Sequence, residues 1–123
     1  MELGYARTPL RRKLVDAVLR GEKTATASLV TDYEPHSEEP MPVVGSRFLL
    51  LDYDDRVVGI IETTGVSAVP AREVDLSFAH DEGEGFETVA DWREAHEEFW
   101  HDQAITDDTL IVCQRFRLVE SNA

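Results

Sequence analysis

Three consecutive segments of this chain have the pattern of β-strands, and no helical pattern separates them. In KTATASLV, at residues 23–30, hydroxyl side chains alternate with apolar ones, which is the period of a strand. SRFLLLDY (46–53) and VVGIIETTGV (57–66) are joined by the tight turn DDR, as in a hairpin. A last strand, TLIVCQRFRLV, follows at 109–119. These strands cannot all be joined as βαβ units, so the sequence predicts an α+β fold with a curved, partly closed sheet.

Two longer helices are predicted, one before the first strand and one before the last strand. Thr8 can cap the first helix, Pro9 suits its first turn, and Gly21 supplies a left-handed stop. Thr88 begins the second helix, and apolar and aromatic side chains at helical spacing extend it to about Gln103. Short helical turns are expected between the third strand and this second helix.

The bulk composition is that of one soluble domain. The 123 residues, 42% of them hydrophobic, show no repeat or composition shift, so a single domain over residues 1–123 is predicted. No apolar run approaches the roughly 20 residues of a membrane helix, and the start lacks the apolar core of a signal peptide. The one cysteine, Cys113, lies in an apolar run and is expected to be buried. We therefore expect a cytoplasmic protein with no membrane partner, and the sequence leaves its oligomeric state open.

The formal net charge of −13 is unevenly distributed. Residues 1–23 hold six basic and three acidic side chains, whereas the other hundred residues hold six basic and twenty-two acidic ones. Proteins hold long nucleic acids through the phosphates, so this acidity argues against a DNA partner. The acidity does not argue against a nucleoside as partner, or against a short single-stranded RNA that binds at a local cluster of basic residues. The simpler interpretation is that the acidic charge keeps the protein soluble.

Lys23 is the first candidate for chemistry. It follows the predicted helix end and enters a strand of small residues, where loss of solvation would lower its pKa. Thr24, Thr26 and Ser28 share one face of that strand, and one of them could act as a nucleophile with a lysine as its base. The competing interpretation is a solvent-facing lysine followed by threonines that simply favour strands.

Three glutamates are further candidates. Glu82 and Glu84 lie in HDEGEG, where two glycines allow a close approach of the backbone to a ligand, and carboxylates suit general acid–base catalysis. The alternative is a solvated acidic turn. Glu62 lies in the middle of a strand, and it could face a pocket or the water side of an edge strand.

Metal and cofactor chemistry finds no support in the residue spacing. The sequence contains no HxxxH, CxxC or HExxH motif, so no metal site is predicted. It also lacks GxGxxG and Walker motifs, so no cofactor is expected. His96 lies beside Trp92 and Phe99 on the apolar helix face, and we interpret it as a core histidine.

Six segments together resemble a known family. GEKTATASL, VGSRFLLLD, GIIETTGV, EVDLSFAHDEGEG, DWREAHEEFW and VCQRFRLV occur in the order found in ASCH-domain proteins, over residues 14–119. The resemblance implies a PUA-like mixed β-barrel flanked by helices, with a cleft beside the first helix. It also implies a role in handling RNA or modified nucleosides. The family includes small bacterial amidohydrolases, which remove the acetyl group of acetylcytidine, and a ribonuclease that uses the same cleft.

The resemblance assigns candidate roles to particular residues. The lysine and threonine of the acetylcytidine amidohydrolases match Lys23 and Thr26, and their glutamate matches either Glu84 or Glu82. This chain is similar to a longer bacterial branch, because the acetylcytidine enzymes lack the EGEG and WREAH segments as they occur here.

These observations lead to one leading hypothesis and two alternatives. The leading hypothesis is hydrolysis of the amide of a modified nucleoside such as N(4)-acetylcytidine. Lys23 would act as general base, Thr26 would attack or position a water, and Glu84 or Glu82 would carry the proton to the leaving amine. The residues expected to bind the substrate are Thr24, Ser28, Glu62 and Arg20. The alternatives are a non-catalytic RNA-binding module and a metal-independent ribonuclease, and the polar loop 31–42 could act as a lid.

Overall fold

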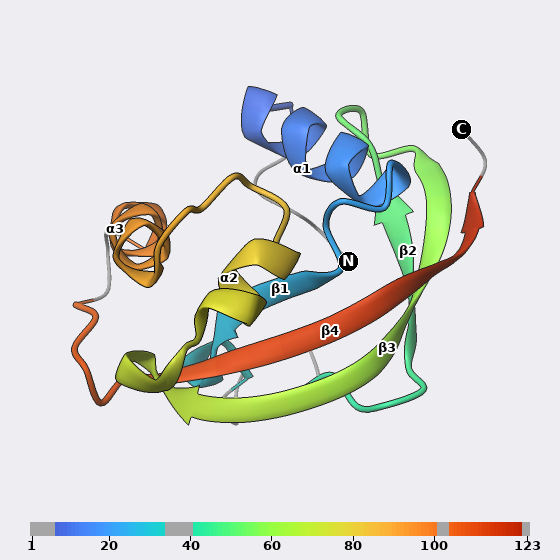
Figure 1. Cartoon of the computed structure of the whole chain (residues 1–123). Coiled ribbons are helices and arrows are strands. Elements are labelled where there is room, and N and C mark those ends of the chain that lie inside the picture. Colours follow the sequence, from blue (N-terminus) through green and yellow to red (C-terminus); the bar gives the residue numbers. More distant parts are fainter. Residues whose placement is uncertain (1–6, 34–40, 101–103, 122–123) are drawn as a thin grey trace.

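The computed structural model of the chain describes residues 7–33, 41–100 and 104–121. Three α-helices, four strands and two short 3-10 helices occur in these ranges. Figure 1 shows how the helices and strands are arranged. In chain order they are α1 (Pro9–Leu19), β1 (Ala25–Leu29), η1 (Val30–Tyr33), β2 (Arg47–Leu51), β3 (Val57–Pro70), η2 (Ala71–Glu73), α2 (Leu76–Asp81), α3 (Val89–Phe99) and β4 (Leu110–Ser121). Most of the loop expected to act as a lid, residues 34–40, lies outside the described residues.

The four strands form one antiparallel sheet in the order β1-β4-β3-β2. Figure 1 shows β3 and β4 as long, curved neighbours, which make the sheet curl. Register shifts between Ile60 and Ile61 and between Thr63 and Gly65 interrupt the pairing of these two strands, and such bulges increase local bending. The predicted PUA-like α+β fold is confirmed, and the described strands form an open half-barrel in which β1 and β2 are the edges.

The helix ends follow from local chemistry. The Oγ1 atom of Thr8 accepts a hydrogen bond from the backbone N–H of Arg11 at 3.2 Å, and that of Thr88 accepts one from Asp91 at 3.0 Å. The expected extension of the second helix to Gln103 is wrong, because α3 ends at Phe99. Trp100 departs from helical dihedral angles, and its side chain is buried in the core.

Two hydrophobic clusters make the core. One joins α1 to the sheet, through residues such as Val18, Ile61 and Phe116. The other lies under α2 and α3, where Trp92 is fully buried, and it includes the buried Cys113. No helix in the described part of the chain is long and apolar enough to cross a membrane.

Candidate active site

Lys23 enters the interior directly after α1. The backbone N–H groups of Glu22 and Lys23 both donate to the carbonyl oxygen of Ala17, at 2.9 and 3.1 Å, which folds this segment back onto the helix. The Lys23 side chain is only 2% exposed, and its Nζ donates hydrogen bonds to the carbonyl oxygens of Ala25 (2.8 Å) and Glu82 (3.3 Å). Burial lowers the pKa of Lys23 because it removes water from the ammonium group, and the nearby carboxylates only partly oppose this effect.

A turn after α2 brings the two glutamates to Lys23. We call residues 82–85 the glutamate turn. Asp75 caps α2, and the helix ends just before Glu82. Gly83 has a left-handed φ of +68°, and a Cβ atom there would lie 2.5 Å from the carbonyl oxygen of Glu22. Only glycine therefore lets the turn lie against the segment that carries Lys23.

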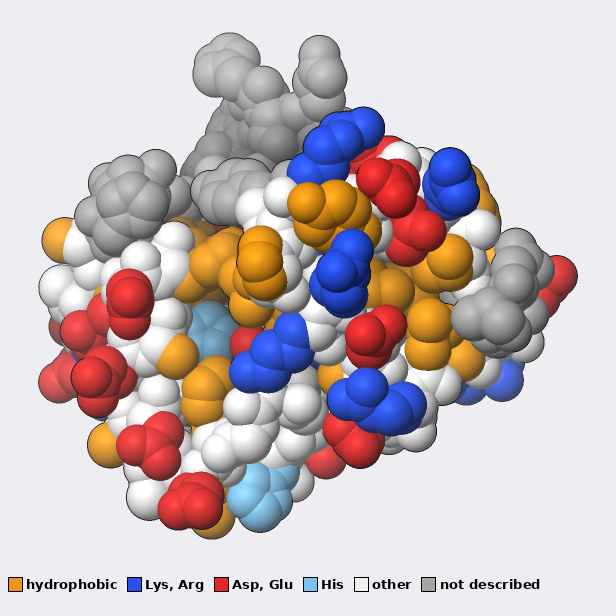
Figure 2. Space-filling model, turned by 90° about the horizontal axis from the view of Figure 1, so that it is seen from above, with side chains coloured by type: hydrophobic (Ala, Val, Ile, Leu, Met, Phe, Trp, Pro, Cys, Tyr) orange, Lys and Arg blue, Asp and Glu red, His pale blue; other side chains and the backbone are white. Residues whose placement is uncertain are grey.

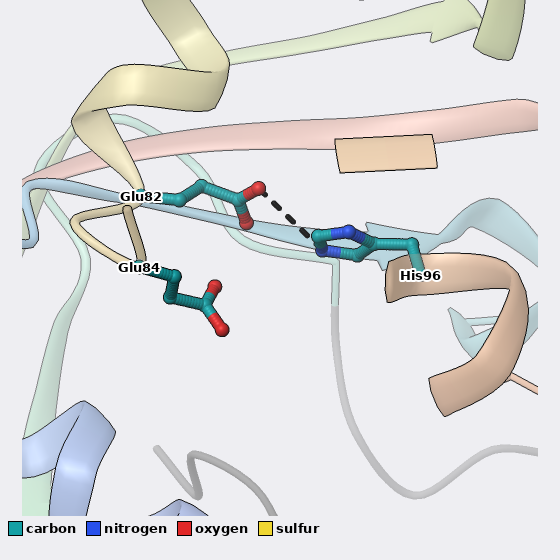
Figure 3. Close-up of side chains that lie close together, drawn as sticks. All are labelled: Glu82, Glu84 and His96. Carbon is teal, nitrogen blue, oxygen red and sulfur yellow. Dashed lines mark ion pairs between the residues drawn. The ribbon is translucent and has the colours of Figure 1, made fainter. Parts of the chain in front are cut away.

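The two glutamates of this turn have different surroundings. Glu82 is fully buried; one of its carboxylate oxygens, Oε2, accepts a hydrogen bond from Trp92 Nε1 and lies 3.4 Å from His96 Nε2. Glu84 is partly exposed, and its Oε2 lies 3.8 Å from Lys23 Nζ. Burial raises the pKa of Glu84, although the Lys23 ammonium group acts in the opposite direction. Figure 3 shows both glutamates extending from the turn on the side that faces His96.

His96 is a core residue, as expected, and it also borders the two glutamates. Its ring stacks on Trp92 with 4.3 Å between centroids, and its Nδ1 lies 2.8 Å from the carbonyl oxygen of Trp92. Phe86 and Trp100 contact the same ring at tilted angles. The helical spacing revealed that His96 faces inward, but no local pattern linked it to the glutamate turn.

The site is open to solvent on one side. Figure 2 shows a hollow in the face seen from above, where a histidine ring is recessed among hydrophobic side chains, close to acidic and basic ones. Of the histidines that the structure describes, His96 is buried and His80 is exposed. A separate open groove of about 400 Å³ lies along β3 and β4, and none of the predicted site residues lines it.

The hydroxyl residues of β1 and of the position just before it lie at different places. The backbone N–H of Thr24 donates to Asp81 at 2.7 Å, which ties β1 to α2 near the site. Ala25 packs in the core, so strand alternation places Thr26 on the opposite face, across from Gln114. No hydrogen bond among the described residues joins Thr26 to Lys23 or to either glutamate of the turn. The Oγ atom of Ser28 bonds with the hydroxyl of Tyr33 at 2.8 Å.

Two other predicted substrate-binding residues have surface partners instead. Glu62 accepts hydrogen bonds from Arg47 and Arg117 at 3.0 Å each, and these bonds hold its pKa below the ordinary value. Arg20 is exposed and pairs with Glu22 at 3.1 Å. The structure therefore brings Lys23 together with the glutamate turn, and no hydrogen bond or ion pair among the described residues joins Glu62 or Arg20 to them.

Comparisons with known proteins agree with this architecture. The family model for the ASCH domain matches residues 4–120. An ASCH domain from Lactobacillus crispatus is 37% identical, with a TM-score of 0.77 over 88% of this chain and 71% of that one. A protein from Enterococcus faecalis V583 is 32% identical, with a TM-score of 0.85 over 98% of this chain and 75% of that one. An ASCH protein from Zymomonas mobilis shares the fold. It is 13% identical, with a TM-score of 0.53 over 85% of this chain and 63% of that one. No curated protein matches the sequence.

Proposed function

Because this chain belongs to the ASCH domain family, we propose that it hydrolyses the amide of a modified nucleoside such as N(4)-acetylcytidine. One observation carries the proposal: the buried ammonium group of Lys23 lies 3.8 Å from the carboxylate of Glu84, which is partly exposed to solvent. Amide hydrolysis needs a group that moves protons and a group that stabilises negative charge on the carbonyl oxygen, and this pair supplies both.

In the proposed reaction, Lys23 acts as a fixed cation. Two of its three N–H groups donate hydrogen bonds to the carbonyl oxygens of Ala25 and Glu82, so the third N–H remains to donate to the acyl oxygen of the substrate. The sequence favours a general base at this position, but a nitrogen that already donates to two carbonyls is better suited to stabilise an oxyanion. Because Lys23 is buried, its charge is less screened by water than that of a surface lysine.

Glu84 moves the proton in this scheme. Its carboxylate takes a proton from water while the water oxygen attacks the acyl carbon. The carbon–nitrogen bond then breaks, and the same proton passes to the leaving nitrogen, which gives the free carboxylic acid and the unmodified nucleoside. Thr26 is given no covalent role, because it has no described bond to Lys23 or to Glu84. Glu82, which is buried and bonded to Trp92, is assigned to holding the turn.

Thr24, just before β1, and Ser28, on β1, are proposed to contribute to substrate binding, and Glu62 and Arg20 are left as weaker candidates. Cytoplasmic action agrees with a single buried cysteine, Cys113, that has no partner for an internal disulfide.

The test is to incubate the purified protein with N(4)-acetylcytidine and to measure cytidine and acetate by chromatography. We expect turnover by the wild type, and a loss of at least about 100-fold in kcat/KM in Lys23→Met, which removes the charge and keeps the length. Arg72→Met is the matched control, because it removes an exposed cation that pairs with Asp108 and is not among the candidate site residues. If Lys23→Met keeps wild-type turnover, as Arg72→Met is expected to do, the proposal is wrong.

Short single-stranded RNA, supplied in a parallel assay, distinguishes the alternatives. Salt-sensitive binding without any product would favour the RNA-binding module. Cleavage of the RNA in the presence of a chelator would favour the ribonuclease. In either case, the absence of cytidine release from the nucleoside would count against the proposed amide hydrolysis.

A further inference from the structure

The geometry points to a binding site for one divalent transition-metal ion between Glu82, Glu84 and His96. One oxygen of each carboxylate and one ring nitrogen of the histidine all lie within 4.8 Å of one another. Figure 3 shows the three side chains converging from the glutamate turn and from α3. The sequence contains no short metal-binding motif, because the ligands come from two elements at least twelve residues apart.

The tautomer of His96 supports this inference. Its Nδ1 lies 2.8 Å from the carbonyl oxygen of Trp92, which can only accept, so Nδ1 carries the proton. In a neutral ring the other nitrogen, Nε2, then points a lone pair toward the Glu82 carboxylate at 3.4 Å. Two acceptors that face each other in a buried site need either a proton or a metal ion between them. Metal-binding histidines have this same arrangement, with the second ring nitrogen bonded to a carbonyl.

Glu82 is held in a position that suits a ligand. The indole N–H of Trp92 donates to its carboxylate, and the same tryptophan supplies the carbonyl that orients His96. Two ligand atoms with bonds of about 2.0–2.1 Å to a tetrahedral zinc ion lie about 3.4 Å apart. The observed separation of 3.4 Å between Glu82 Oε2 and His96 Nε2 equals that value. Both ligands are therefore already spaced for one ion.

The charge of the cluster also favours a cation. The carboxylates of Glu82 and Glu84 meet here, and Lys23 is the lysine or arginine that an ion pair places within 4 Å of either of them among the described residues. Two carboxylates that share one ammonium group in a largely buried space make a site suited to a further cation.

The ligand types define the class of ion. One imidazole nitrogen and two carboxylate oxygens suit Zn²⁺, Co²⁺ or Mn²⁺, whereas Ca²⁺ and Mg²⁺ prefer sites made of oxygen alone. Three protein ligands leave at least one position open toward the hollow. Because such an ion would occupy the Glu84 carboxylate that the proposed hydrolysis uses for proton transfer, we expect it to inhibit that reaction. Binding itself does not depend on the proposed function.

The test uses tag-free protein that has been treated with a chelator and then freed of it. We expect Co²⁺ to bind with a stoichiometry of one and to quench the tryptophan fluorescence, because both Trp92 and Trp100 contact the His96 ring. Calorimetry with Zn²⁺ should give the same stoichiometry. His96→Gln should weaken the binding of both ions at least tenfold. His80→Gln, which removes an exposed histidine outside the cluster, should leave the affinity unchanged.

A second variant controls for a folding defect. Glu84→Gln changes a partly exposed ligand, and its far-ultraviolet circular dichroism and urea midpoint report whether the fold is intact. The inference is overturned if neither ion binds the wild type. It is also overturned if folded Glu84→Gln binds as tightly as the wild type. Cytidine release by chelator-treated protein is scored separately, so the metal site and the proposed hydrolysis can fail independently.

Discussion

Gly83 is the residue at which the glutamate turn touches the segment that carries Lys23. Its φ is +68°, and a Cβ there would lie 2.5 Å from the Glu22 carbonyl oxygen, whereas at Gly85, with a φ of +83°, a Cβ would meet nothing within 4 Å. We expect Gly83→Ala to lower the free energy of unfolding by more than about 2 kcal/mol, and Gly85→Ala by about 1 kcal/mol. Urea denaturation measures both values, and equal losses would contradict the close contact.

The reactivity of the Cys113 thiol reports whether this side chain is buried. The thiol is buried, and burial raises its pKa to about 11, mainly because the thiolate would lose its hydration. At about pH 8 only about one thiol in a thousand would be ionised, and the thiolate is the reactive form. We expect the native protein to react slowly with iodoacetamide and the protein in guanidinium chloride to react rapidly. Mass spectrometry counts the modified chains, and rapid labelling of the native protein would show that the thiol is accessible.

Helix α3 carries Trp92 and His96, and Trp100 follows at its end, so the N-cap of this helix is a test at the scale of an element. Thr88 Oγ1 accepts a hydrogen bond at 3.0 Å from the backbone N–H of Asp91, one of the N–H groups at the helix start that have no partner within the helix. We expect Thr88→Ala to cost about 1 kcal/mol of unfolding free energy, and Thr88→Ser to restore most of it because the oxygen is kept. The midpoint of urea unfolding is the measurement. If serine is as destabilising as alanine, the hydroxyl is not the stabilising group.

Glu62 connects three strands, since it lies on β3 and accepts from Arg47 on β2 and from Arg117 on β4. These bonds lower its pKa in the folded state, so its contribution to stability is complete above the unfolded pKa, near 4.5, and is lost as the pH falls toward the folded pKa. We expect Glu62→Gln to be less stable than the wild type at neutral pH and equally stable in acid. Thermal unfolding across this pH range measures the difference in stability between Glu62→Gln and the wild type. A stability difference that persists in acid would indicate a packing effect.

The elements differ in how far their local sequence determines them. The starts of α1 and α3 could be predicted because a capping threonine acts within one helical turn of its own position. The hairpin of β2 and β3 could be predicted equally well, because alternating side chains and a tight turn specify it. The pairing of β3 with β4, with its two register shifts, could not be predicted, because it joins residues that are far apart in the chain.

The same distinction applies to the candidate site. Lys23 and the double-glycine segment could be singled out because each is locally unusual, and their proximity was expected only from the family resemblance. The partnership of His96 with Glu82 had no local signal, because it depends on where α3 packs relative to the glutamate turn. The surface partners of Glu62 lie on two neighbouring strands, which the alternation of one strand does not reveal. Arg20, by contrast, pairs with Glu22, two residues further along the chain.

The charge of the whole molecule makes the proposed substrate testable through ionic strength. A protein with a net charge of −13 attracts no polyanion over long distances, and a neutral nucleoside has no phosphates through which it could release counterions. We therefore expect the KM for N(4)-acetylcytidine to be the same in low and in high concentrations of potassium chloride. Short single-stranded RNA, if it binds through the basic residues of α1, should lose affinity steeply over the same range.

Initial rates for the nucleoside and fluorescence anisotropy for the RNA provide the comparison. A KM that rises with salt as steeply as the RNA affinity falls would indicate that the site recognises a phosphate, and that the substrate is a nucleotide or an RNA end.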